Sequence, residues 1–110
     1  MKPSALLIIS LLSPLVTAAE KTLIVPSDSK AQYSVLEKDG VGDERTIITK
    51  RTGSSGTSYS KRLYNCANNS VMYLGTGDSM AEMESSTPDP GMSPIVERSI
   101  AYYVGIEACR

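Results

Sequence analysis

The stretch SKRLYNCANNSVMYLGTG, residues 60–77, contains Cys66 and has the pattern of two strands around a turn. Aromatic and β-branched residues at 59–66 and 71–74 favour extended backbone. Residues 67–70, Ala-Asn-Asn-Ser, are turn formers, and asparagine tolerates left-handed backbone. We therefore expect an antiparallel strand pair here, with the rest of the chain arranged around it.

The chain has two cysteines, Cys66 in this stretch and Cys109 one residue from the end. Two cysteines allow a single intramolecular pairing. A Cys66–Cys109 disulfide would tie the last segment to the central strand, which the chain-entropy model values at about 4 kcal/mol. The alternatives are two reactive thiols, or an intermolecular bridge through Cys109.

The first 19 residues have the three parts of a secretory signal peptide. A positive start (Met1-Lys2) precedes an apolar run at residues 6–16, and Thr17-Ala18-Ala19 supplies the small residues of a cleavage site. An apolar run of about 12 residues falls short of the ~20 that span a bilayer, so we expect no membrane span after cleavage. The sequence thus predicts a signal peptide (1–19) and one small domain (20–110), exported to the periplasm or secreted, where a disulfide persists.

Several short segments alternate or are rich in β-branched residues. We expect strands at residues 22–25, 33–38, 46–51, 59–66 and 71–74. The Gly/Asp-rich residues 39–43 join two of them as a hairpin, and the small polar residues 52–58 form a flexible connection. Gly75 and Gly77 are expected to end the last strand. Residues 33–74 thus form an antiparallel meander of four strands, with 22–25 as an edge strand.

The C-terminal third contains one predicted helix and one ambiguous segment. Residues 79–82 have the S-x-x-E spacing of a capping box, which predicts a short helix to about residue 85. Residues 86–94 carry three prolines and are expected to form a loop. In residues 100–108, the alternation of Ile, Tyr and Val favours a strand, whereas Ser99 as an N-cap favours a helix.

A family resemblance bears on that ambiguity. Residues 61–66 have a K/R-x-x-Y-x-C pattern, and Pro94-Ile95-Val96, Ser99-Ile100 and Cys109 follow downstream. This set resembles the small bacterial envelope proteins of the surface-adhesin protein E type, although Glu97-Arg98 stands where that family often has Pro-Gly. The resemblance implies that the last segment is a helix whose terminal cysteine bonds back to the central strand. It also implies adhesin-like contact with other proteins and pairing of two copies through a sheet edge.

The expected fold is therefore α+β. An antiparallel β-meander of about four to five strands carries a short helix, and a C-terminal helix is tethered to it by one disulfide.

The composition argues against enzymatic activity, metal or cofactor binding and nucleic-acid binding. The chain contains no histidine, which is the usual general base near neutral pH and the partner of serine and cysteine nucleophiles. With both cysteines oxidised we expect no metal site, no cofactor and no enzymatic activity. The 11 Lys and Arg residues against 12 Asp and Glu give no basic excess, so we expect no nucleic-acid partner.

Two basic pairs fall on strands that we expect to be neighbours. With Tyr59, the residues Lys50, Arg51, Lys61 and Arg62 are predicted to form a basic, amphipathic patch for a protein partner. The alternative is an ordinary solvated face with scattered charges. On this interpretation the protein is a non-catalytic, exported interaction protein.

A second hypothesis depends on Ser55-Gly56-Thr57-Ser58-Tyr59. This segment is similar to the Ser-Gly-x-x-Tyr loop that some small, disulfide-bonded lysozyme inhibitors insert into the enzyme's cleft. There the loop follows the Y-x-C strand, whereas here it precedes that strand. The hypothesis makes Ser55 and Gly56 the contact residues of a periplasmic enzyme inhibitor.

Overall fold

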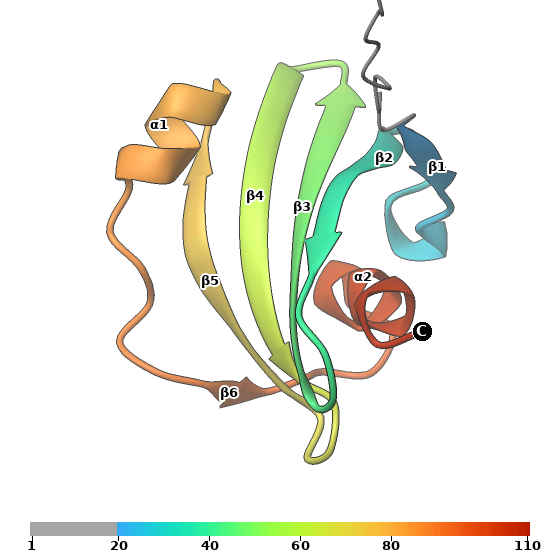
Figure 1. The fold of residues 1–110 in the computed structure, drawn as a ribbon. Helices are drawn as coiled ribbons and strands as arrows, with labels where there is room; N and C mark the ends of the chain where they lie inside the picture. Colours follow the sequence, from blue (N-terminus) through green and yellow to red (C-terminus); the bar gives the residue numbers. More distant parts are fainter. Residues whose placement is uncertain (1–19) are drawn as a thin grey trace, which may run out of the picture.

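The structure is a computed structural model that describes residues 20–110 (Figure 1). The predicted signal peptide, residues 1–19, lies outside the described residues. Six strands form one antiparallel sheet in chain order. They are β1 (Lys21–Leu23), β2 (Gln32–Asp39), β3 (Glu44–Gly53), β4 (Gly56–Asn65), β5 (Ser70–Gly77) and β6 (Ser93–Pro94). The predicted antiparallel sheet with two helices is confirmed, but the sheet has six strands rather than four to five.

Two α-helices cover opposite faces of this sheet (Figure 1). The six-residue helix α1 (Met80–Ser85) lies against β5, and α2 (Ile100–Ala108) lies against the other face. A 3₁₀ turn, η1 (Pro26–Asp28), links β1 to β2. Within residues 20–110 no helix has the length and apolar content needed to cross a bilayer.

Two segments that were predicted to lie outside the strands belong to paired strands in the structure. The predicted flexible connection at 52–58 is wrong, because the β3–β4 ladder continues to Gly53 opposite Gly56 and leaves a two-residue turn. β5 likewise runs through Gly75 to Gly77 rather than ending before them. A Cβ at Gly75 would overlap the carbonyl oxygen of Met83, so glycine here lets α1 pack closely on the strand.

The outer edge of β5 is covered by the segment that follows α1. The predicted loop at 86–94 ends in β6, which pairs with the start of β5. Before that, Asp89 and Tyr73 exchange two hydrogen bonds, and the Thr76 amide donates to Ser86 Oγ. These long-range bonds explain why residues with little strand propensity join the sheet.

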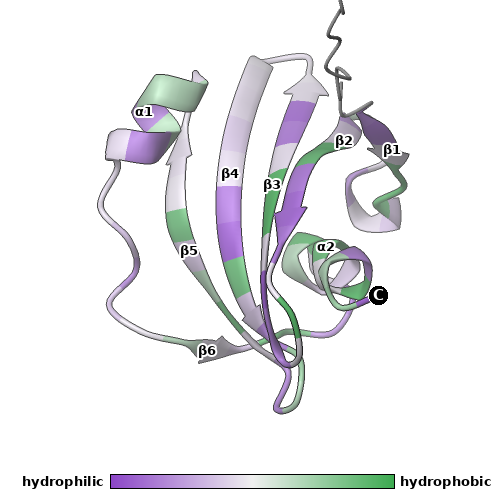
Figure 2. Ribbon diagram, viewed as in Figure 1, coloured by the Kyte–Doolittle hydropathy of each residue, from purple (hydrophilic) through white to green (hydrophobic). Residues whose placement is uncertain are grey.

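The main core lies between the sheet and α2, whose inward face appears green in Figure 2. Its buried members are Val35, Ile47, Tyr64, Val71, Val104 and Ala108. The Tyr64 hydroxyl donates a 2.6 Å hydrogen bond to the Ala101 carbonyl, and burial raises the pKa of this phenol so that it stays a donor. The Tyr64 ring lies against Gly105, where a Cβ would approach it too closely.

Helix α2 resolves the ambiguity of the last segment. The strand alternative is wrong, because residues 100–108 are helical, as the resemblance implied. Ser99 is the N-cap, and its hydroxyl accepts a hydrogen bond from the Tyr102 amide at 3.1 Å. The Cys66–Cys109 disulfide is confirmed, with the two Cα atoms 5.8 Å apart. It joins the end of α2 to the turn after β4.

A buried carboxylate adds a second attachment of α2 to the sheet. The Glu107 side chain is 3% exposed and accepts hydrogen bonds from the ammonium groups of Lys21 (2.9 Å) and Lys38 (3.2 Å). Arg110 approaches the other carboxylate oxygen at 3.5 Å. Burial by itself raises the pKa of Glu107, but the two lysines outweigh it, so the pKa lies below the ordinary 4.5. Glu107 thus ties α2 to β1 and β2.

Candidate functional site

The predicted basic residues are divided between the two faces of the sheet. β3 and β4 are neighbours, as expected, but successive side chains on a strand point to opposite faces. Lys50 and Lys61 lie on the α1 face, whereas Arg51 and Arg62 lie on the α2 face. Figure 2 shows hydrophilic bands on both β3 and β4. The four cations therefore do not make one patch.

Arg51 is engaged within the chain. Its Nε donates to Asp28 Oδ2 at 2.7 Å and its Nη2 donates to Oδ1 at 3.3 Å, while the Tyr33 hydroxyl donates to Oδ2 at 2.7 Å. The bonds from Arg51 and Tyr33 lower the pKa of Asp28. Burial, followed by the Asp28 carboxylate, raises the pKa of Tyr33 to about 12. The cluster fastens η1 to the sheet, so Arg51 is not a free surface cation.

Arg62 is buried, with 4% of the residue exposed. Its Nη1 donates to Thr49 Oγ1 at 2.9 Å and its Nη2 donates to the Tyr73 hydroxyl at 3.0 Å. A direct contact with a large protein partner would need this guanidinium at the surface. The structure places it inside instead.

Two of the other predicted residues, Lys50 and Tyr59, lie in one cross-strand row on the α1 face. In this row Thr22, Ser34, Lys50 and Tyr59 are consecutive register partners from β1 to β4, and Gly77 of β5 continues it to α1. Lys50 and Tyr59 are half-buried. Lys61 lies two residues from Tyr59 on the same face. We call Thr22, Ser34, Lys50 and Tyr59 the Lys50 row.

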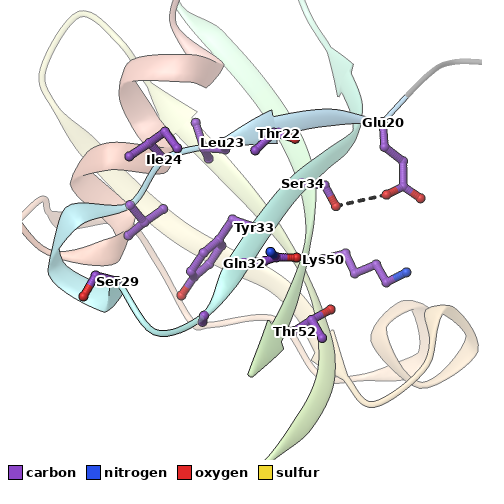
Figure 3. Close-up of a pocket in the computed structure, with 12 residues that line it drawn as sticks. Glu20, Thr22, Leu23, Ile24, Ser29, Gln32, Tyr33, Ser34, Lys50 and Thr52 are labelled. Carbon is purple, nitrogen blue, oxygen red and sulfur yellow. Dashed lines mark hydrogen bonds between the residues drawn. The ribbon is translucent and has the colours of Figure 1, made fainter. Parts of the chain in front are cut away.

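A hollow of about 550 Å³ lies at the β1 end of this row (Figure 3). Lys50 and Thr52 of β3 line it together with Ser34 of β2, whose hydroxyl donates to Glu20 Oε1 at 3.1 Å. Ile24 also lines it and is 74% exposed. A cation, an anion and an exposed aliphatic side chain thus border the same hollow.

Beside the hollow lies the outer edge of β1. In the part of the chain that the structure describes, β1 pairs with β2 only, so its other edge has no strand partner. Sequence reasoning named the strand but missed Glu20, Ile24 and Ser34 as site residues. Regular counting outward from the β2–β3 hairpin would have placed Ser34 opposite Arg51, because it misses the bulge between Val35 and Glu37 that shifts the pairing by one residue.

Ser55 and Gly56 lie at the tip of the β3–β4 hairpin, and both are exposed. The tip extends beyond the neighbouring strands, because β5 pairs no farther than Tyr59 and β2 no farther than Thr52. Gly56 has φ of +122°, a backbone conformation that glycine adopts readily. The structure therefore presents Ser55 on a narrow projection, apart from the hollow.

Comparison with family models, curated proteins and solved structures finds no match to this chain. Among residues 20–110 no three His, Cys, Asp or Glu side chains gather in a way that could hold a metal ion. The site is thus described by its own geometry: an unpaired strand edge, a polar hollow beside it, and a basic and aromatic row leading away.

Proposed function

We propose that this chain is a non-catalytic, exported protein that binds other proteins at the cell envelope or outside the cell, in the manner of an adhesin. The observation that carries the proposal is the β1 edge beside the Figure 3 hollow, which has no strand partner in the described part of the chain, residues 20–110. Unpaired strand edges bind extended segments through main-chain hydrogen bonds, and adjoining pockets take alternate side chains of the added strand.

The contrast with the opposite edge of the sheet supports this proposal. There, β6, Asp89 and Ser86 occupy the main-chain groups of β5. Proteins commonly cover edges that would otherwise associate with other strands. A β1 edge that has no strand partner among residues 20–110, and that adjoins Ile24 and a polar hollow, fits a binding edge.

The partner that this edge fits is an extended protein segment with an apolar side chain that packs on Ile24. Lys50 and Glu20 offer it one cation and one anion at the hollow. A second copy of the chain could supply such a segment through its own β1, which is the self-pairing that the family resemblance predicts. Both partners would compete for the same edge.

A matched pair of variants tests the proposal. Ile24 and Val96 are 74% and 72% exposed, and only Ile24 borders the hollow. For the oxidised mature protein, Ile24→Asp should weaken capture of a specific partner from envelope extract at least tenfold, whereas Val96→Asp should not. Light scattering over a concentration series would show whether self-pairing responds in the same way. Equal binding by both variants would refute the β1 edge as the contact.

A second candidate function is inhibition of a lysozyme-type enzyme. The observation that favours it is the projecting tip, which holds Ser55 beyond the neighbouring strands. Ser55→Ala should abolish inhibition in a lysozyme assay, and Ser54→Ala at the adjacent turn position is the matched control. A native protein without inhibitory activity would eliminate this candidate and leave the edge-binding proposal untouched.

A further inference from the structure

The buried guanidinium of Arg62 has no anionic partner among residues 20–110. No carboxylate oxygen of this part of the chain lies within 4 Å of it. The Thr49 and Tyr73 hydroxyls accept two of its N–H groups, and its carbon Cζ lies 4.7 Å from the centre of the Tyr73 ring. An aromatic face compensates a buried cation only in part. Buried charges are ordinarily paired, because an unpaired one loses its hydration without replacement.

The residues around Arg62 do not supply the missing charge. Its direct same-face neighbours across the sheet are Ile47 on β3 and Tyr73 on β5. Ser60 and Tyr64 flank it along β4. The charged side chains that this register places nearby are two further cations, Arg45 opposite Tyr64 and Lys38 opposite Ile47. The Asp89 carboxylate lies beyond Tyr73, where it accepts a hydrogen bond from the Tyr73 amide and makes no ion pair with Arg62.

The site also has more hydrogen-bond donors than acceptors. Arg62 Nε is buried and has no hydrogen-bond partner in the structure. The hydroxyl oxygens of Thr49 and Tyr73 are already acceptors for Arg62, so each can still donate its own proton. Neither hydroxyl donates to another group among the described residues. Three donors around one cation fit a ligand that only accepts hydrogen bonds.

We propose that the Arg62–Thr49–Tyr73 cluster is a binding site for a small oxoanion, a carboxylate or phosphate group. The guanidinium would supply charge-assisted hydrogen bonds, and the two hydroxyls would add neutral ones. Tyr73 is only half-buried, so it connects the buried guanidinium with solvent. The site lies on the α2 face, which the β1 edge and the Lys50 row do not use.

Thermal unfolding of the oxidised mature protein tests this site. The melting temperature is measured in rising sodium phosphate and, separately, sodium acetate, against sodium chloride at equal ionic strength and pH. Binding to the folded state should raise the melting temperature by roughly 5–10 °C at ten times the dissociation constant, and the rise should then grow with the logarithm of the anion concentration. The anion that gives this rise at the lower concentration identifies the preferred group, phosphate or carboxylate.

Two variants of adjacent β4 residues separate binding from the general stabilisation that such salts produce. Arg62→Met should remove the logarithmic rise, whereas Lys61→Met, on the opposite face, should retain it. Tyr73→Phe keeps the ring but loses one hydrogen-bond donor, so about tenfold more anion should be needed for the same rise, which tests the site even if Arg62→Met does not fold. No logarithmic rise in the native protein, or an equal rise in the Arg62 and Lys61 variants, would overturn the proposal. Neither outcome depends on the proposed protein partner.

Discussion

The two helices cover opposite faces of one sheet, but they are attached to it in different ways. Helix α2 is held by the Cys66–Cys109 disulfide, by the Tyr64 hydroxyl and by the Glu107 ion pairs. Helix α1 is six residues long and buries one side chain, Met83, with 1% exposed. Helix α2 is thus attached to the sheet by covalent, polar and apolar contacts. Helix α1 depends mainly on the packing of one side chain, Met83.

This difference separates the contacts that stabilise the domain from the surface proposed to bind a protein partner. The α2 face contains the main core, and its polar groups are largely engaged with one another. The α1 face is covered only beside β5, and it leaves the Lys50 row and the Figure 3 hollow accessible. We therefore expect substitutions that weaken the attachment of α2 to destabilise the whole domain. Substitutions in α1 should destabilise that helix alone. Four experiments test that expectation.

The largest effect is expected from breaking the covalent attachment. Cys66→Ser should lower the free energy of unfolding by about 2–5 kcal/mol, because the unfolded chain is no longer cross-linked. Urea unfolding of the oxidised proteins measures it, and limited proteolysis should cut the last ten residues of the variant first. Reduction of the native protein is the control and should reproduce the loss. Unchanged unfolding would mean that the disulfide contributes nothing to α2.

Removing the buried side chain of α1 should have the next largest effect. Met83→Ala should cost about 3 kcal/mol, from lost burial and the cavity left behind. Hydrogen exchange should show faster opening of α1 with little change in α2. If both helices lose protection together, the two faces are coupled, and α1 does not open independently of α2.

The Glu107 ion pairs predict a pH dependence of the α2 face. Because the folded chain holds the pKa of Glu107 below 4.5, the unfolded chain binds this proton more tightly. The stabilisation is complete above about pH 5 and is lost as the pH falls through the lower, folded-state pKa. Glu107→Gln should cost about 2 kcal/mol at pH 7 and progressively less below pH 4. Glu84→Gln, an exposed change in α1, is the matched control in urea unfolding at each pH.

The smallest effects concern the two helix caps. Ser79 accepts a hydrogen bond from the Glu82 amide, and Ser99 accepts one from the Tyr102 amide, each at 3.1 Å. Replacement of either serine with alanine should cost about 1 kcal/mol. By hydrogen exchange, Ser79→Ala should open only α1, whereas Ser99→Ala should also loosen the disulfide-bonded end. If Ser99→Ala speeds exchange only in the first turn of α2, the loss of this cap does not affect the disulfide-bonded end of the helix.

Local signals in the sequence determined the central features of the fold. The β-branched runs, the Asn-rich turn and the Ser79 cap depend on neighbouring residues, so their strands, turn and helix could be predicted. Two cysteines left a single intramolecular pairing. The helical state of residues 100–108 was not set by propensity, because Ile, Tyr and Val favour strands. Packing against Tyr64 and the disulfide decided it.

Only the tertiary structure decided how the surface is divided. Strand alternation places Lys50 and Lys61 on one face and Arg51 and Arg62 on the other, but sequence alone does not say which face a helix covers. β6 pairs with β5 because the chain returns to that edge, although Ser93–Pro94 has no strand propensity. The β1 edge and the buried charge of Arg62 likewise arise from contacts distant in sequence. Long-range register, which local propensity does not encode, therefore determined both candidate sites.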